Sequence, residues 1–266
     1  LPIILFLTLK SIFFLKDKKI EKIISIGGYM SLPIILAGRV LKLDIYLIEP
    51  NHILGRANKY FLNFCKKIFC YAENIKNFPI AFKNKIIVIY PLIQKYIYEI
   101  KPSNKTKDKF TLLVVGGSQG ADIFDNDLKK SIVNISKETP TKVIHQTNKK
   151  NIFFLQNFYL KNNLENKIFS FEKNFINLIK QSDLCITRAG ASSLAEISIM
   201  NKPFIAIPLP TAKDDHQMKN AKFYEERGCC WVLDQRILTK EKLLNLVSNI
   251  LKKRSDFITK KKILRN

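Results

Sequence analysis

A glycine-rich turn after a hydrophobic segment is the first place in this sequence that can do chemistry. Residues 111–121 read Thr-Leu-Leu-Val-Val-Gly-Gly-Ser-Gln-Gly-Ala, which predicts a buried strand, a sharp turn and a helix start. Gly116 and Gly117 let the backbone approach a ligand closely. The free N–H groups of the following helix favour an anion, and the Ser118 hydroxyl adds a donor. The motif lacks the Gly-Lys-Ser/Thr ending of a P-loop, so alone it predicts a phosphate site of unspecified kind.

A second strand-to-helix turn, Thr187-Arg-Ala-Gly-Ala-Ser-Ser-Leu-Ala-Glu196, lies in the same half of the chain. Ser193 and Glu196 have the S-x-x-E spacing of a capping box, so one interpretation is that both only cap their helix. The other is that Ala191 and Ser192 offer backbone N–H groups to a diphosphate, while Glu196 accepts hydrogen bonds from ribose hydroxyls. Two glycine turns at strand ends of one sheet are typical of a nucleotide-diphosphate crevice.

A third turn follows a predicted strand at the same edge of the sheet. It runs through Pro208-Leu-Pro and Asp214-Asp-His-Gln-Met-Lys-Asn-Ala221. Gln217 and Asn220 either bind sugar hydroxyls there or merely begin a helix.

The first turn also fits G-x-S-x-G, the nucleophile elbow of serine hydrolases. Ser118, Asp183 and His216 occur in the Ser, Asp, His chain order of that class. Against this alternative, residues 119–120 lead into an ordinary helix, and His216 follows two carboxylates in a polar turn. The hydrolase interpretation is therefore the weaker one.

The elements that position these turns alternate between strand and helix, which predicts an α/β fold with parallel sheets. In the first half, strands are predicted at 22–26, 44–48 and 86–90, with helices at 31–40 and 58–67. In the second half, strands are predicted at 110–115, 142–145, 167–171, 184–187, 204–208 and 230–233, and helices at 122–136, 152–160, 175–181, 193–200, 216–227 and 240–252. Residues 101–109 hold no apolar side chain and are predicted to link domains at 1–100 and 110–266.

The composition shows a large basic excess. The 266 residues include 45 Lys or Arg and 22 Asp or Glu, giving a net charge of +23, and all but seven of the basic residues are Lys. This charge indicates either solvated lysine faces or a surface that meets phosphates. A nucleic-acid binder is disfavoured because no clustered Arg-aromatic stripe or known motif is present.

Cysteine and histidine spacing predicts neither a disulfide framework nor a metal site. The five cysteines form no CxxC pair and lie in apolar runs, which is typical of buried thiols in a reducing compartment. The three histidines lack HExxH spacing.

The N-terminal residues 1–15 are almost entirely apolar and are followed by Lys16-Asp-Lys-Lys. A signal peptide carries its positive charge before the apolar region, and a spanning helix needs ~20 largely apolar residues, so the segment fits neither. It is interpreted as a plain core helix or as a helix at a membrane surface. The first residue is Leu and the first half has about three strands, so roughly two βα units are expected upstream.

Several of these motifs together resemble the MurG family of glycosyltransferases. In the second half they are GGSQGA at 116–121, HQT at 145–147, RAGASSLAE at 188–196, PLP at 208–210 and DDHQMKNA at 214–221; in the first half they are GGYMSLP at 27–33 and EPN-x-x-x-GRANK at 49–59. The resemblance implies a GT-B fold, two Rossmann-like domains with the donor cleft between them, of which the N-terminal one is incomplete here. It also implies no cofactor and no metal.

The same resemblance implies an activity and its partners. The enzyme would be an inverting transferase that moves GlcNAc from UDP-GlcNAc to the 4-hydroxyl of undecaprenyl-diphosphate MurNAc-pentapeptide, in peptidoglycan synthesis. Helix N-termini rather than a metal would stabilise the leaving UDP. The apolar, basic N-terminal segment would dock the protein on anionic lipid, as a peripheral protein at the cytoplasmic face of the bacterial inner membrane.

Position by position, the resemblance assigns roles in donor binding. Residues of the first turn would contact the diphosphate, those of the second turn the phosphate and sugar through their amides, Glu196 the ribose and Gln217 the GlcNAc hydroxyls. Phe171 would cover the uracil, Glu172 would offer its backbone to the base, and Asn51 would reach the donor sugar. The full set is Asn51, Ser118, Gln119, Phe171, Glu172, Ala191, Ser192, Ser193, Leu194, Ala195, Glu196 and Gln217.

Three departures from the family pattern concern catalysis. The glycine-rich first loop with the usual histidine base is expected before Leu1, Ile48 stands where the family has a histidine, and Ile93 where it has an arginine. His52 is the nearest titratable alternative as base, although a loop histidine is more often simply exposed. A second hypothesis is therefore a non-catalytic remnant that binds UDP-GlcNAc through residues 110–233 and transfers nothing.

Overall fold

The computed structural model describes residues 2–99, 109–117 and 122–263. Its chain divides into two compact units, Leu1–Leu92 and Ile93–Asn266. The predicted linker at 101–109 lies almost entirely outside the described residues, so the domain boundary placed there stays a prediction.

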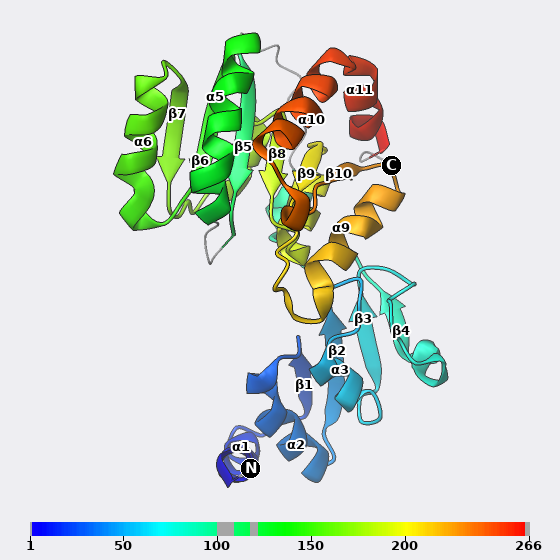
Figure 1. Ribbon diagram of the computed structural model, residues 1–266. Coiled ribbons are helices and arrows are strands. Elements are labelled where there is room, and N and C mark those ends of the chain that lie inside the picture. Colours follow the sequence, from blue (N-terminus) through cyan, green and yellow to red (C-terminus); the bar gives the residue numbers. More distant parts are fainter. Residues whose placement is uncertain (1, 100–108, 118–121, 264–266) are drawn as a thin grey trace. The chain divides into compact units, whose positions relative to one another are not determined.

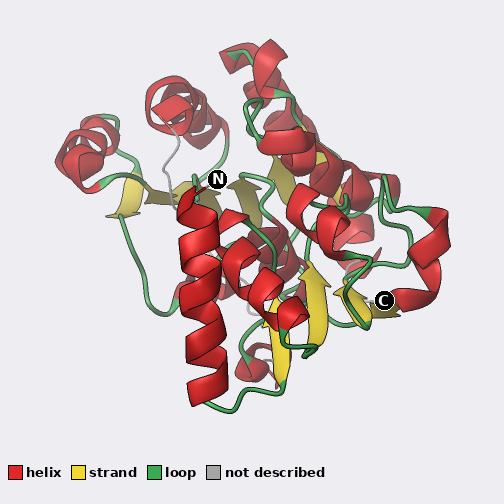
Figure 2. Ribbon diagram, turned by 90° about the horizontal axis from the view of Figure 1, so that it is seen from below, coloured by secondary structure: helices red, strands yellow, loops and turns green. Residues whose placement is uncertain are grey.

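Unit 1 is built on a parallel sheet of four described strands in the order β1-β2-β3-β4 (Figure 1). Its elements are α1 (Pro2–Asp17), β1 (Lys22–Ser25), α2 (Leu32–Val40), β2 (Asp44–Glu49), α3 (Arg56–Phe61), β3 (Lys67–Cys70) and β4 (Ile86–Val88). The long helix α1 starts near the N mark in Figure 2 and packs beside α2. Leu15 of α1, Ile23 of β1 and Ala37 of α2 form their shared core.

Strand β3 is the main departure from the predicted elements of this unit. The helix predicted over 58–67 ends at Phe61, and Lys67–Cys70 forms a strand where none was predicted. Its burial alternates between exposed and buried positions, as in a strand with one face on the core. The sequence prediction was wrong because four residues are too few to separate a period of two from the end of an apolar helix.

Unit 2 holds a six-stranded parallel sheet in the order β10-β9-β8-β5-β6-β7. Its main elements are α4 (Lys95–Glu99), β5 (Phe110–Val115), η3 (Phe124–Leu128), α5 (Lys129–Glu138), β6 (Thr141–Gln146), α6 (Ile152–Lys161), β7 (Glu165–Phe169), α7 (Phe175–Gln181), β8 (Leu184–Thr187), α8 (Ala191–Ile199), β9 (Phe204–Ala206), α9 (His216–Glu226), β10 (Cys230–Val232), η6 (Gln235–Ile237), α10 (Lys240–Lys252) and α11 (Arg254–Ile263). The strand order reverses between β5 and β8, which is the Rossmann switch point.

The central strand β5 is apolar on both faces because helices cover both sides of its sheet. Leu112 and Val114 pack into one cluster with residues of α5, α6 and α10. Leu113 and Val115 pack into the other with residues of α7, α8 and α9. A strand buried on both faces reads as a continuous hydrophobic run, and the predicted bounds of β5 and β8 are confirmed.

Candidate active site

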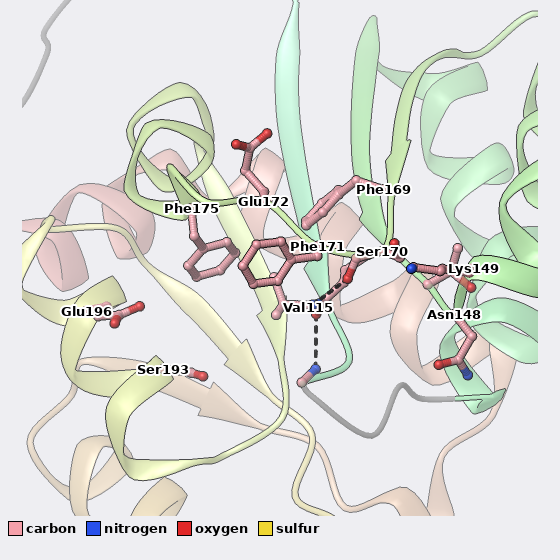
Figure 3. A pocket seen from close by; sticks show the side chains of 13 residues that line it. Val115, Asn148, Lys149, Phe169, Ser170, Phe171, Glu172, Phe175, Ser193 and Glu196 are labelled. Carbon is pink, nitrogen blue, oxygen red and sulfur yellow. Dashed lines mark hydrogen bonds between the residues drawn. The ribbon is translucent and has the colours of Figure 1, made fainter.

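A cavity of about 490 Å³ opens at the carboxyl edge of the unit 2 sheet (Figure 3). The ends of β5, β6 and β7 line it, together with α7 and α8. Ser193 and Glu196 lie on one side in Figure 3, Asn148 and Lys149 lie on the other, and Phe171 lies between them. A pocket at the carboxyl ends of parallel strands beside the switch point is the usual position for a nucleotide in this type of sheet.

Helix α8 begins two residues earlier than predicted, and this changes the role of its serine. Gly190 is the N-cap, so Ser193 lies within the first turn and makes no side-chain cap. The predicted capping box is therefore wrong, and Ser193 and Glu196 both line the cavity instead. The prediction failed because Gly190 provides the extended backbone that a helix N-cap needs without any side-chain bond.

In the first turn of α8, some of the backbone amides proposed to bind a ligand are free of helix hydrogen bonds and others are not. The Leu194 N–H already donates to the Gly190 carbonyl at 3.0 Å, and the Leu194 and Ala195 side chains are buried in the core. The N–H groups of Ala191, Ser192 and Ser193 precede it and have no acceptor within the helix. Three amides at the positive end of the helix are thus available to an anion.

Glu196 is the half-buried acid of this cavity. Burial raises the pKa of its carboxyl group above the ordinary glutamate value. Within the described residues, no side chain or backbone group donates a hydrogen bond to that carboxylate. A desolvated carboxylate with open lone pairs is suited to a ligand that brings its own donors, such as a diol.

The aromatic wall of the cavity is Phe171, whose side chain is 81% exposed, with Phe175 beside it. Its neighbour Glu172 accepts a hydrogen bond from the Asn174 N–H at 3.1 Å and lies 3.2 Å from Lys167 Nζ, and these contacts lower the pKa of the Glu172 carboxyl. The Glu172 side chain is thus engaged by the protein, which leaves its backbone for the role expected of it.

Helix α9 holds the turn that leads into α8. Gln217 Oε1 accepts hydrogen bonds from the N–H groups of Ala189 at 3.2 Å and Leu209 at 3.0 Å, while buried Asn220 donates to the Ala189 carbonyl at 3.1 Å. These contacts tie the ends of β8 and β9 together. Gln217 and Asn220 therefore do more than begin a helix, and the Gln217 Nε2 group has no acceptor among the described residues.

Behind the wall that holds Thr147 lies a buried polar network, which the sequence analysis missed. Asp125 accepts hydrogen bonds from Thr147 Oγ1 at 2.5 Å and Asn151 Nδ2 at 2.8 Å. Burial alone would raise the pKa of Asp125, but its hydrogen-bond donors outweigh burial and lower it. His145 lies 3.4 Å from Asp125 Oδ1 and 2.9 Å from the Tyr159 hydroxyl. Burial lowers the pKa of His145, so the ring is neutral and fixes the cavity wall without adding charge.

The geometry removes the serine hydrolase alternative. Asp183 precedes β8 and accepts a hydrogen bond from the Thr111 N–H at 2.8 Å, at the amino edge of the sheet. His216 begins α9, beyond the carboxyl end of β9, and its ring bonds the Lys213 carbonyl at 2.7 Å. An acid and a base at opposite edges of one sheet cannot form a catalytic triad. Ser118 and Gln119 lie outside the described residues.

The EPN motif of unit 1 surrounds a buried carboxylate. Glu49 is 2% exposed, and its Oε1 accepts hydrogen bonds from the backbone and side-chain nitrogens of Asn51 at 3.2 and 3.0 Å. Its Oε2 accepts from the Gly55 N–H at 2.8 Å and from Asn58 Nδ2 at 2.9 Å. A Cβ at Gly27, where φ is +86°, would lie 2.9 Å from Asn58 Oδ1. Glu49 therefore positions the loop that carries Asn51.

His52 follows in the same loop and is 5% exposed, so the expectation of an exposed loop histidine is wrong. Its carbonyl accepts a hydrogen bond from the Lys76 N–H at 3.0 Å, which anchors the loop. Ile48 is buried at the end of β2, and Ile93 packs against the unit 2 core. Both isoleucines act as core residues, and His52 as a base stays a prediction.

All five cysteines are free and buried, as predicted. In the part of the chain that the structure describes, no group of three His, Cys, Asp or Glu residues is arranged to hold a metal ion.

Family comparisons identify the class of both units. Residues 111–265 match the model of the glycosyltransferase family 28 C-terminal domain, and residues 2–70 match that of the family 28 N-terminal domain. Together with two parallel α/β units and a pocket at a switch point, these matches define a glycosyltransferase of the GT-B type.

Individual relatives narrow this class. A protein of Pelagibacter ubique is 46% identical over 98% of this chain and 74% of its own length, and one of Rickettsia bellii is 33% identical over 93% and 74%. Both are named UDP-N-acetylglucosamine–N-acetylmuramyl-(pentapeptide) pyrophosphoryl-undecaprenol N-acetylglucosamine transferase. The crystal structure of Acinetobacter baumannii MurG superposes with a TM-score of 0.82 at 26% identity, over 100% of this chain and 76% of that one. The chain belongs to the MurG family within glycosyltransferase family 28.

Proposed function

We propose that this chain transfers GlcNAc from UDP-GlcNAc to the 4-hydroxyl of the muramyl sugar in undecaprenyl-diphosphate MurNAc-pentapeptide. The observation that carries the proposal is the unit 2 cavity, which is lined by an acid with no described hydrogen-bond donor, by an exposed aromatic ring and by Ser193 of the first turn of α8. These three groups match a ribose, a base and a diphosphate. The names of the relatives supply the sugar and the acceptor.

In the proposed donor complex, Glu196 accepts hydrogen bonds from the ribose hydroxyls, and Phe171 stacks on the uracil beside the Glu172 backbone. The amides of Ala191, Ser192 and Ser193 bind the diphosphate. Because Gln217 Oε1 is held by two backbone amides, only its Nε2 group remains to bind a GlcNAc hydroxyl.

The proposed reaction is a single inverting displacement. The acceptor oxygen forms a bond to the anomeric carbon of GlcNAc as the bond from that carbon to the β-phosphate oxygen breaks. The hydroxyl proton passes to a base, for which His52 is the candidate in unit 1, and UDP leaves with the electron pair. The α8 amides stabilise the charge that develops on UDP because they are already oriented toward it.

Replacing Phe171 by alanine tests the base stack. Stacking of a base on an aromatic side chain contributes ~1–3 kcal/mol, so we expect the KM for UDP-GlcNAc to rise about tenfold or more. The ring is exposed, so the thermal midpoint should stay unchanged. Phe171→Tyr, which keeps an aromatic face, is the matched control; an unchanged KM in Phe171→Ala would contradict the stack.

We also propose that α1 docks the protein on anionic lipid, as a peripheral protein at the cytoplasmic face of the bacterial inner membrane. In the described structure only Thr8 and Leu15 of α1 are buried, which supports a surface role for this helix over that of a plain core helix. Its exposed apolar residues are Ile3, Ile4, Leu5, Phe6, Leu7, Leu9, Phe13 and Phe14. Lysines within and just after α1 add attraction to anionic headgroups. Among the described helices, none is both long and apolar enough to cross a membrane.

A charge placed on α1 is expected to weaken membrane binding. Burial of a large apolar side chain contributes ~1.5–3 kcal/mol, so Phe13→Glu should lower partitioning onto phosphatidylglycerol vesicles about tenfold or more. Phe153→Glu on α6 is the matched control, since Phe153 is 76% exposed and Phe13 73%. Equal losses in both variants, measured by vesicle sedimentation, would contradict docking through α1.

Separate assays of binding and transfer test the proposed function. Calorimetry measures UDP-GlcNAc binding, and labelled GlcNAc transfer to a polyprenyl-diphosphate muramyl-peptide measures turnover. We expect both. Binding without transfer would favour the non-catalytic remnant, and absence of binding would contradict the donor site itself.

A further inference from the structure

Arg188 is a buried cation that has no carboxylate partner among the described residues. Arg188 directly follows β8 and is 8% exposed. Its guanidinium lies 5.0 Å from the centroid of the Phe124 ring. Among the described residues, no acidic group forms an ion pair with it, and burial lowers its pKa. Arginine nevertheless remains charged in proteins.

The described side-chain hydrogen bonds of Arg188 use only one of its three guanidinium nitrogens. Nη1 donates to the Ile207 carbonyl at 3.1 Å, the Pro208 carbonyl at 3.5 Å and Gln235 Oε1 at 2.6 Å. All three acceptors are neutral, so they orient the guanidinium without cancelling its charge. In the described part of the chain, Nε and Nη2 have no acceptor. Among the groups that the structure describes, none therefore occupies the planar fork that suits a phosphate.

The position of Arg188 joins it to the cavity. Its N–H donates to the carbonyl of Val115, a residue that lines the cavity, at 3.2 Å. Ala189 is fixed by Gln217 and Asn220, and Gly190 caps α8. Arg188 thus lies two residues before Gly190, the N-cap of the helix whose first amides are open to an anion. Leaving a charge buried and uncompensated is costly, so an anion at this turn would relieve that cost.

We propose that Arg188 supplies the buried counter-charge for the donor diphosphate and for the UDP that leaves. This inference rests on the proposed function and adds a cationic residue to the amides of α8. Arg188 should therefore affect binding of the diphosphate and not binding of the uracil or the ribose, because a guanidinium interacts with phosphate charge.

Comparing UDP with uridine tests this role. We would measure both dissociation constants by calorimetry on the full chain, at low and at moderate salt. Arg188→Met is expected to lower UDP affinity about tenfold or more, while uridine affinity stays within about twofold. Arg188→Lys keeps the charge and should retain most of the preference for UDP over uridine.

The matched control is Arg236→Met. Arg236 is adjacent to Gln235 but exposed, and it is already paired with the Asp234 carboxylate at 2.6 Å. Its removal should change neither affinity. If Arg188→Met does not fold by circular dichroism, Arg188→Gln provides the neutral variant.

The outcomes separate this inference from the proposed function. Equal losses for UDP and uridine would overturn the inference, since they indicate that Arg188 only shapes the turn, and so would an unchanged UDP affinity. Wild-type binding of neither ligand would overturn the donor site and the inference together. A loss confined to UDP, and absent from Arg188→Lys, would support the proposal.

Discussion

Replacing Glu196 by glutamine is expected to raise the KM for UDP-GlcNAc by about 10- to 150-fold, because hydrogen bonds to a charged group contribute ~1.5–3 kcal/mol. The half-buried carboxylate has no donor among the described residues, so its interaction with the ribose would be made only in the complex. Initial-rate kinetics with varied UDP-GlcNAc measure the effect. Glu165→Gln is the matched control, since its carboxylate is held by Lys109 and Lys142 away from the cavity.

The pH dependence gives this prediction a second test. Burial raises the pKa of Glu196, so the carboxylate is protonated at a higher pH than an ordinary glutamate. We expect the KM to rise as pH falls through that raised pKa, and Glu196→Gln should remove this rise. The stability of the folded protein depends on pH in the opposite sense. Because the pKa of Glu196 is raised in the folded state, any stability that the neutral acid contributes is lost as pH rises through that pKa. At pH 7 Glu196→Gln should therefore melt no lower than wild type; a lower midpoint would indicate a structural role.

Replacing Glu49 by alanine is expected to have the largest effect on stability, a loss of about 3 kcal/mol in the free energy of unfolding. The substitution removes the acceptor for four donors on Asn51, Gly55 and Asn58, in a site that is 2% exposed. Transfer should also fall sharply, because the Asn51 loop loses its anchor. Urea unfolding followed by circular dichroism measures the first effect.

Two further variants separate the causes. Glu73→Ala removes an exposed glutamate of the same unit and should stay within about 0.5 kcal/mol of wild type. Glu49→Gln keeps one acceptor oxygen and should lie between wild type and alanine. If the Glu49→Ala protein were as stable as wild type, the buried carboxylate would not stabilise this loop, and the prediction would be contradicted.

The sequence predicted most strands and helices of unit 2 because their signals are local and strong. Strands such as β5 and β8 are buried on both faces, and the α10 pattern is flanked by Thr239, whose side chain caps the helix by accepting from the Lys242 N–H. Strand β3 was missed because a four-residue alternation has no distinct signal. Helices α4 and α11 were missed as well; α4 is only five residues long, and α11 is rich in lysine.

The candidate site was less predictable because its determinants are long-range. The S-x-x-E spacing favoured a capping box, and only the backbone at Gly190 shows that the helix starts earlier. The sequence does not predict that Arg188 has no acidic partner among the described residues, because this depends on which residues surround it in space. The role of Glu49 could have been predicted from the sequence, because an acid at the end of a strand followed by Asn51 and Asn58 is typical of a hydrogen-bonded loop.

The described residues that line the cavity all lie between Val115 and Glu196, in unit 2. The proposed contacts with the nucleotide thereby come from one continuous stretch of the chain, whereas the proposed contacts with lipid come from α1. If α1 docks on lipid as proposed, substitutions in α1 should change the affinity for a membrane without changing the affinity for the nucleotide. In this proposal, the specificity for the donor nucleotide and the specificity for the membrane would change independently of each other.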